Sequence, residues 1–141
     1  MGQQQLLLLV LGIVIVGLAV VVGIQAFDDA NAQAEQDAVR MDLLRISADA
    51  KAWAEKPSAF GGNEDSDPAT TKYEGLNFND LGYTDSAGDL LADGAAYVTP
   101  NGSYAVTTAG ATLVITATHS EGSTVMTVSA AGVASFAFTA S

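Results

Sequence analysis

The side chains that most often carry out catalysis are scarce in this sequence. It contains one histidine, His119, and no cysteine. A catalytic serine would need a recognisable setting, and no G-x-S-x-G motif provides one. A single imidazole with no thiolate leaves a zinc or copper site short of ligands. We therefore expect no catalytic residue, no metal site and no cofactor, and we expect His119, beside a Ser-Glu-Gly turn, to be a solvated strand end.

Three oxygen-bearing side chains, Asn63, Asp65 and Asp67, are spaced like the first ligands of a calcium-binding loop. Pro68 stands where such a loop requires glycine, and no glutamate follows at the twelfth position. A solvated acidic loop is the preferred interpretation, and calcium binding is the alternative.

The tripeptide Asn101-Gly102-Ser103 has two interpretations. It fits the acceptor pattern for N-glycosylation at Asn101. Asn-Gly is also a preferred hairpin turn, and we favour the turn because strand-like sequence flanks it on both sides.

The charge balance excludes several classes of partner. The net charge is −11, from 16 acidic and 5 basic residues. A chain this acidic repels nucleic acid and anionic membrane surfaces. We expect no nucleic-acid partner.

The longest apolar segment runs from Leu6 to Ile24 without a charge or a proline. It matches the roughly 20 residues that a helix needs to cross the hydrocarbon of a bilayer. Three interpretations fit: a cleaved secretory signal, a single-pass membrane anchor, and the core of an assembly of many copies. Ala30-Asn31-Ala32 has the small-x-small pattern of a signal cleavage site, but no basic residue precedes the run.

The helix predicted for this segment continues to Lys56. Residues 28–56 contain no glycine and no proline, are rich in alanine, and are followed at once by Pro57. Residues 3–56 together predict one helix of about 80 Å. Its first half is apolar all round and its second half is amphipathic.

The second half carries two apolar stripes. One stripe, mostly of small side chains, suits close contact with neighbouring helices; the other carries more bulk and suits a domain that rests on the last turns of the helix. A simple anchor has no need of this half, whereas a packed bundle of copies does. The first stripe comprises Phe27, Ala30, Ala34, Ala38, Met41 and Ala48, and the second comprises Leu43, Ile46, Ala50 and Trp53.

The rest of the chain predicts a connection and a sheet. Residues 57–94 are rich in Gly, Asn, Asp and Ser but also carry apolar side chains, so we expect an ordered connection with a short helical turn over 85–91. Alternating segments separated by turn residues predict an antiparallel meander of four or five strands. The predicted strands are 95–99, 103–108, 111–119, 123–130 and 133–140.

The predicted fold class is α+β, with the long N-terminal helix packed on the C-terminal meander. Its three parts are residues 1–56, with 6–24 as the transmembrane or filament-core segment, residues 57–94, and residues 95–141. Threonine and serine dominate one face of the sheet, which leaves the other face for the helix. The expected contacts join Leu43, Ile46, Ala50 and Trp53 to Leu113, Ile115, Phe136 and Phe138.

A short polar leader with Gly2, an apolar helix, an amphipathic continuation and a small β domain together resemble a type IV pilin or pseudopilin. The resemblance covers the whole chain in layout and the N-terminal third in sequence. Members of that family wait in the inner membrane as monomers, and their apolar half-helix then becomes the core of a helical filament. Prepilin peptidase cuts after a glycine just before the apolar segment, and Gly2 is the matching position. Leu7 stands where most processed bacterial pilins carry a glutamate, and the uninterrupted helix is also similar to archaeal pilins.

The resemblance implies a structural subunit and not an enzyme. Its partners would be identical copies in an extracellular filament, the membrane before assembly, and the assembly machinery. Two alternatives remain open: a pseudopilin of a secretion system, and a monomeric, membrane-anchored β domain that binds a ligand or glycan. The expected assembly core comprises Leu6, Leu7, Leu9, Val10, Ile13, Val14, Gly17, Leu18, Val21, Ile24, Phe27, Ala30, Ala34, Ala38 and Met41.

Overall fold

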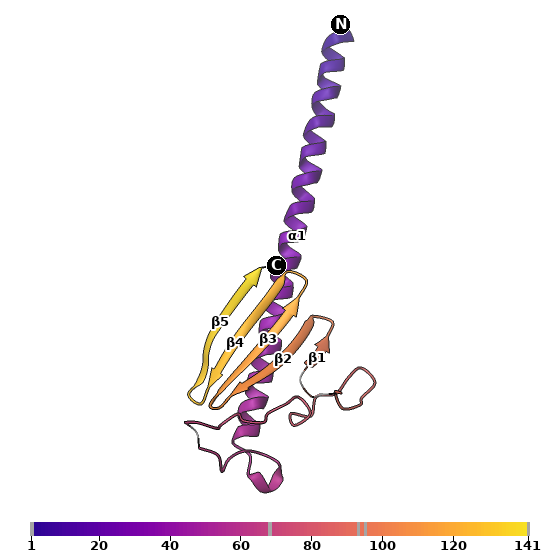
Figure 1. Cartoon of the computed structure of the whole chain (residues 1–141). Coiled ribbons are helices and arrows are strands. Elements are labelled where there is room, and N and C mark those ends of the chain that lie inside the picture. The colour runs from indigo at the N-terminus through magenta and orange to yellow at the C-terminus, as the bar shows by residue number, and fades with distance from the viewer. Residues whose placement is uncertain (1, 68, 93, 95, 141) are drawn as a thin grey trace. The chain divides into compact units, whose positions relative to one another are not determined.

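A computed structural model describes residues 2–67, 69–92, 94 and 96–140 of the chain. It has one long helix, a short 3-10 helix and five strands (Figure 1). The chain divides into two compact units, Met1–Glu35 and Gln36–Ser141, so the second half of the long helix belongs to the same unit as the sheet. In chain order the elements are α1 (Gly2–Ala54), η1 (Ser58–Phe60), β1 (Ala96–Thr99), β2 (Gly102–Ala109), β3 (Thr112–His119), β4 (Gly122–Ser129) and β5 (Gly132–Ala140).

The long helix confirms the prediction over residues 3–56 to within two residues at each end. Its last turn closes when the amides of Glu55 and Lys56 donate to the carbonyls of Lys51 and Trp53, both at 3.1 Å. Pro57 then ends the helix, because a proline has no N–H to donate and disfavours helical geometry in the residue before it.

The sheet is an antiparallel meander in the order β1-β2-β3-β4-β5, which confirms the predicted topology (Figure 1). Each hairpin has a two-residue loop, so the last four strands begin at intervals of ten residues. A turn lies at the predicted position, but its loop is Pro100-Asn101, and Gly102 pairs with Thr99 as the first residue of β2. Ala95, where the first strand was predicted to begin, lies outside the described residues. The register between β4 and β5 shifts once, at Thr127/Val128.

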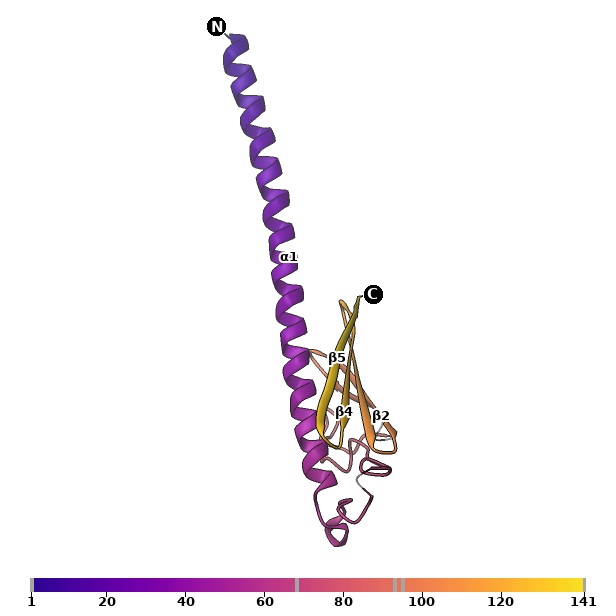
Figure 2. The same ribbon diagram turned by 90° about the vertical axis from the view of Figure 1, so that its left-hand side faces the viewer.

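Helix and sheet form two layers with one apolar core between them (Figure 2). The helix contributes a row spaced three and four residues apart, which places its members on one face. The sheet contributes alternate residues from three strands. The helix row is Val39, Leu43, Ile46, Ala50 and Ala54, and the sheet side comprises Tyr104, Leu113, Ile115, Ala117, Met126 and Val128. Trp53 packs against this core and is partly buried.

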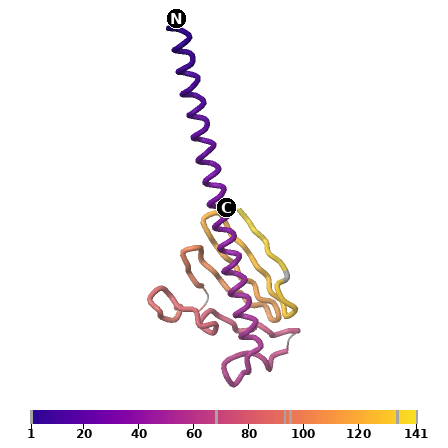
Figure 3. Tube along the Cα trace, turned by 180° about the vertical axis from the view of Figure 1, so that it is seen from behind, coloured from indigo at the N-terminus to yellow at the C-terminus, as the bar shows by residue number. Residues whose placement is uncertain are grey.

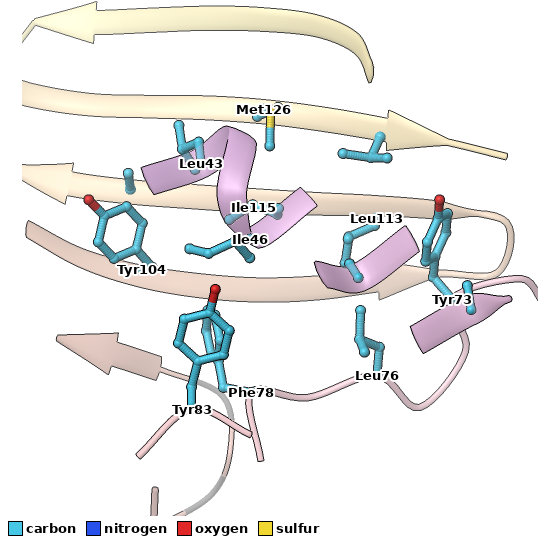
Figure 4. Packing of buried hydrophobic residues seen from close by; sticks show 14 of the residues in the cluster. Leu43, Ile46, Tyr73, Leu76, Phe78, Tyr83, Tyr104, Leu113, Ile115 and Met126 are labelled. Atoms are coloured by element: carbon cyan, nitrogen blue, oxygen red, sulfur yellow. The ribbon is translucent and has the colours of Figure 1, made fainter. Parts of the chain in front are cut away.

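The connection between helix and sheet is ordered and enters the core, as predicted. It buries Tyr73, Leu76, Phe78 and Tyr83, which lie beside the core residues of the sheet in Figure 4. The rings of Phe78 and Tyr83 also contact Tyr97 of β1, and the Tyr83 ring meets Tyr97 edge to face with the centroids 4.7 Å apart. The connection therefore covers the β1–β2 side of the sheet.

The predicted helical turn over residues 85–91 is wrong. Thr84 and Leu90 form an isolated antiparallel bridge, and the segment between them is a turn. A carboxylate oxygen of Asp85 accepts hydrogen bonds from the amides of Ala87 (2.8 Å) and Asp89 (2.9 Å). This side chain satisfies the backbone donors in a way that competes with a helix.

The predicted packing of Phe136 and Phe138 under the helix is also wrong. Both residues lie on the helix-facing side of β5, because they pair with Met126 and Thr124 on β4, which are buried there. They are nevertheless 43% and 40% exposed. A helix is ~10–12 Å wide and strands lie ~4.8 Å apart, so one helix covers only two or three strands. Seen from the helix side in Figure 3, β5 lies clear of the helix.

The opposite face of the sheet is rich in hydroxyls, as expected. One cross-strand row on that face has a hydroxyl on each of the four strands from β2 to β5, in Ser103, Thr118, Ser123 and Thr139. None of these side chains belongs to the buried core of the described residues.

Replacing a core residue of the helix should unfold the second unit far more readily than replacing an exposed neighbour. Leu43 is 0% exposed and Met41 is 74% exposed. We expect Leu43→Ala to lower the free energy of unfolding by about 2–5 kcal/mol, and Met41→Ala by no more than about 0.5 kcal/mol. Thermal unfolding of the full chain in detergent, followed by circular dichroism, measures both. Equal losses would contradict the helix–sheet core.

Gly110 is the tightest point between the connection and the sheet. Its φ is +63°, and a Cβ there would clash with the carbonyl oxygen of Thr70, while its own carbonyl accepts from the amide of Tyr73 at 3.2 Å. Gly75→Ala is the matched control, because its φ is +80° but nothing lies within 4 Å of the added carbon.

We expect both alanine variants to lose about 1 kcal/mol from backbone strain, and Gly110→Ala to lose a further ~1–3 kcal/mol from the clash. Chemical denaturation of the two variants beside the unmodified chain gives the difference. A Gly110→Ala variant as stable as Gly75→Ala would mean that the connection does not pack against the β2–β3 turn.

Candidate assembly surfaces

The first unit contains an apolar helical segment, residues 6–27, whose side chains are exposed on every side. The exposed fractions of its large apolar residues range from 49% at Val10 to 74% at Phe27. A continuous apolar surface of this extent marks contact with a bilayer or with other protein. By length and composition, α1 is sufficient to cross a membrane. Gly12, Gly17 and Gly23 have no neighbouring atom within 4 Å of an added Cβ, so another backbone can approach closely there.

The residues predicted to form the assembly core are on the surface of the single chain. All of them are exposed except Ala38, which is half-buried. Gly2, the position that matches the peptidase site, is the first residue of the helix and is also exposed. Met1 lies outside the described residues, so the structure does not address the processing prediction.

Charge is confined to the middle of the sequence. Residues 28–94 hold all five basic residues and fifteen of the sixteen acidic residues, and Glu121 is the remaining acid. The apolar helix before residue 28 and the strands after residue 95 are therefore almost without charge. Two copies of a chain with a net charge of −11 repel each other least where these neutral surfaces meet.

Two aspartates of α1 hold the β1–β2 side of the domain to the helix. The Tyr104 hydroxyl donates to Asp42 Oδ2 at 2.7 Å, and Asn101 Nδ2 donates to the same oxygen at 3.0 Å. The Tyr83 hydroxyl donates to Asp49 Oδ2 at 2.7 Å. The two aspartates are seven residues apart, about two turns, and so share one side of the helix. Sequence reasoning missed both, because nothing local in the sequence indicates their partners.

The surroundings of three tyrosines raise the pKa values of their hydroxyls. Burial raises the pKa of Tyr104 and Tyr83 above the usual value of 10.0, and their hydrogen bonds to Asp42 and Asp49 raise it further. Burial, with repulsion from Glu55, raises the pKa of Tyr73. The neutral hydroxyl is the form that donates a hydrogen bond, from Tyr83 and Tyr104 to carboxylates and from Tyr73 to the carbonyl of Ser129. These tyrosines therefore remain protonated donors in the folded domain.

The exposed side of the helix in the second unit carries an apolar patch. We call Met41, Leu44 and Ala48 the helix patch. These residues follow the i, i+3, i+7 spacing of a surface that faces a partner, and Met41 and Leu44 are 74% and 47% exposed. Helical periodicity places Met41 and Ala48 opposite the buried row.

A second apolar patch lies on β5. We call Val133, Phe136 and Phe138 the β5 patch. Val133 pairs with the buried Val128, so it shares the helix-facing side with the two phenylalanines. Val133 is 44% exposed.

His119 differs from the solvated strand end that we expected. It is half-buried, and its ring stacks on Phe138 with centroids 5.7 Å apart and planes at 19°. Its Nε2 lies 3.3 Å from Thr124 Oγ1. His119 therefore extends the β5 patch towards β3.

The side chains with calcium-ligand spacing are engaged in local hydrogen bonds. Asn63 Nδ2 donates to the carbonyls of Thr71 (2.9 Å) and Lys72 (3.3 Å), Asp65 accepts from the Ser58 hydroxyl, and Asp67 Oδ1 accepts from the amide of Ala69 at 2.9 Å. Among the residues that the structure describes, no group of three or more histidine, cysteine, aspartate or glutamate side chains could hold a metal ion. Pro68 lies outside that set.

A shallow hollow lies beside the end of α1. It has a volume of about 320 Å³ and is lined by Asp49, Ala52, Trp53, Lys56, Asp80 and Leu81. The Asp49 carboxylate is already bonded to Tyr83. The indole Nε1 of Trp53 is buried with no hydrogen-bond partner among the described residues. The side chain as a whole is only partly buried, and the hollow presents no nucleophile with a base beside it.

Comparison of the chain with known protein families, with curated proteins and with solved structures found no match. The arrangement of surfaces is therefore interpreted from its own chemistry: a charge-free apolar helix, an acidic central region and two exposed apolar patches on the second unit.

The raised tyrosine pKa values predict a loss of stability in alkali. In the unfolded chain these hydroxyls ionise near pH 10, whereas the folded chain holds them neutral to higher pH. Their contribution to stability is full below pH 10 and is lost as the pH rises towards the folded pKa values. We expect the free energy of unfolding to fall above pH 10, and to fall less steeply in the Tyr83→Phe, Tyr104→Phe double variant.

Denaturant titrations at several pH values test this, and the tyrosinate absorbance of the folded chain gives an independent measurement. Single variants at Tyr83 or Tyr104 serve as controls and should show intermediate slopes. An identical alkaline slope in the unmodified chain and the double variant would contradict the assignment of these hydroxyls as donors to Asp49 and Asp42.

Proposed function

We propose that this chain is the structural subunit of an extracellular filament of the type IV pilus kind. Many copies would pack residues 6–24 of α1 together at the filament axis, and the sheet domains would form the outer wall. The observation that carries this proposal is the exposure of the whole apolar helix of the first unit, in a chain whose second unit has a complete core of its own.

The physical basis of assembly is that the apolar helix leaves the bilayer and must be buried elsewhere. In a bilayer, isolated helices gain little from associating by hydrophobicity, because lipid is as apolar as the helix. Once the subunit leaves the bilayer, the same surface must be buried by neighbouring copies. At about 25 cal/mol per Å², a nineteen-residue apolar helix contributes tens of kcal/mol of gross burial, from which the ordering costs of association are subtracted.

The pattern of charge supports the same proposal. The segment assigned to the axis has no charge, so close packing of many copies leaves no buried ion. The acidic residues belong to the part assigned to the wall, where water and salt screen them. A filament of such chains would have a charged, hydrated outer surface and an apolar axis.

The exposed side of the amphipathic half of α1 distinguishes the filament from a monomeric, membrane-anchored β domain. Such a monomer uses residues 6–24 as its anchor and the buried row of the amphipathic half for its core, but it has no use for the exposed Met41 and Leu44. A pseudopilin shares the architecture but forms a short assembly within a secretion system. The length and location of the assembly therefore separate these functions.

Electron cryo-microscopy of filaments sheared from the cell surface tests the proposal. We expect long filaments with residues 6–24 bundled at the axis, and the density at Gly2 shows whether the leader is cut. If this chain occurs in no filament and remains in the membrane, the filament function is refuted and the anchored domain or the pseudopilin takes its place.

A bulky side chain on the small stripe of the helix should block assembly without unfolding the sheet domain. Ala34 is exposed in the single chain, so Ala34→Phe leaves its fold intact, whereas close packing of neighbouring helices has no room for the added ring. We expect loss of filaments from the sheared fraction and normal amounts of the variant in the membrane.

Ala96→Phe is the matched control, since Ala96 is an exposed alanine on β1. It introduces the same ring on the sheet and should leave filament yield unchanged. Filaments of normal yield from the Ala34→Phe variant would show that this side of the helix is not packed against neighbouring subunits.

A further inference from the structure

The second unit carries two apolar patches whose side chains remain largely exposed in the single chain. The helix patch (Met41, Leu44, Ala48) consists of flexible or small side chains, and the β5 patch (Val133, Phe136, Phe138) consists of larger, mostly aromatic ones. Neither patch contains a charged residue. Their sizes are complementary, because aromatic rings pack well against small and adaptable side chains.

The two edge strands of the sheet, β1 and β5, differ in length, composition and neighbours. At one edge, β1 has four residues, is followed by Pro100, and has the aromatic side chains of the connection beside it. At the other edge, β5 has nine residues, none of them charged or proline. Among the described strands β5 pairs only with β4, so its outer edge has no strand partner. Short strands, prolines and charges are among the means by which proteins protect a free edge. β5 has none of these three, although its pairing with β4 has one register shift.

We propose that the β5 patch of one subunit docks on the helix patch of a second copy of this chain. The contact joins two different surfaces, so it is heterologous and can repeat from copy to copy. In the helical arrangement of the proposed filament, where the rotation between copies does not close a ring, such a contact forms an open array and not a symmetric dimer. It rests on the proposed filament function and adds to it a second, lateral contact between sheet domains.

Charge favours a second copy as the occupant. Nearly all the charge of the chain lies in residues 28–94, so the strands from residue 96 onward are the part of the acidic domain that another copy can approach with least repulsion. Lys51 lies one turn beyond Ala48 and is exposed. Its ammonium group can donate to a free carbonyl along the β5 edge of the neighbouring copy.

The contact is too small to act alone. Three side chains on each partner cover far less than the area of a standard protein–protein interface. The apolar helices at the axis hold the copies together, and this raises the effective concentration of each patch for the other. The docking therefore fixes the orientation of the sheet domains in the filament. The contacts between apolar helices at the axis supply most of the free energy of assembly.

Engineered cysteines test the contact in the full chain, because the protein has no cysteine of its own. Phe138→Cys is combined in turn with Met41→Cys, Leu44→Cys and Ala48→Cys, and sheared filaments are oxidised. A disulfide requires Cβ atoms ~3.5–4.5 Å apart, so it forms only across a direct contact. We expect at least one pair to yield a ladder of covalent multimers on a non-reducing gel, with a matching loss of the monomer band.

The matched control is Ala137→Cys with the same three partners. Ala137 is the neighbour of Phe138 on β5 but faces the other side of the sheet, and it is also exposed. Filaments that give a ladder only with Ala137→Cys, or with no pair, overturn the proposal. Covalent dimers from Phe138→Cys alone also overturn it, since they indicate two β5 edges paired symmetrically.

A second measurement tests the contact without engineered cysteines. Phe136→Ser combined with Phe138→Ser should leave filaments that dissociate at a lower temperature than the unmodified ones, and Ala137→Ser should not. Equal dissociation temperatures overturn the docking and leave the filament function standing. Cross-linked chains without any filament would support the docking contact and refute the filament function. The absence of both filaments and cross-links would refute both proposals.

Discussion

A single α-helix is too narrow to cover a five-stranded sheet, and the arrangement of the second unit depends on this mismatch. Five strands span about 19 Å, roughly twice the width that one helix covers. The buried row from Val39 to Ala54 therefore covers the central strands, and the connection places Tyr73, Leu76, Phe78 and Tyr83 beside it. No described residue does the same at β5, which leaves Phe136 and Phe138 exposed. The same mismatch thus accounts for the ordered connection and for the exposed patch.

The hydrogen bonds to Asp42 and Asp49 define how the sheet is aligned on the helix. Apolar contacts alone would allow the sheet to slide or rotate on the helix, because burial depends on area and not on orientation. Two short hydrogen bonds from Tyr104 and Tyr83 to carboxylates two turns apart define one alignment. Both bonds lie on the β1–β2 side of the domain, away from β5.

The distribution of charge along the chain supports the proposed assembly. The chain keeps charge out of the apolar helix and nearly out of the sheet, and it concentrates both signs in residues 28–94. A hydrophobic axis and a neutral sheet edge can then contact other copies, while the acidic region maintains solubility in water. The proposed filament and the proposed docking of β5 on the helix patch use these two neutral surfaces separately.

The sequence alone determined the helix, the meander and the charge-free segment, because each depends on local order: the absence of proline before Pro57, alternation along the strands, and turn residues every ten positions. It also indicated Leu43, Ile46 and Ala50 as the face that covers Leu113 and Ile115. Tertiary structure decided which strands the helix covers, which aspartates meet Tyr83 and Tyr104, and that residues 85–91 form a turn. Alternation assigns Phe136 and Phe138 to the correct face of the sheet, but it carries no information about how far the covering helix reaches. That depends on the width of a helix relative to a sheet, which exists only after the chain has folded.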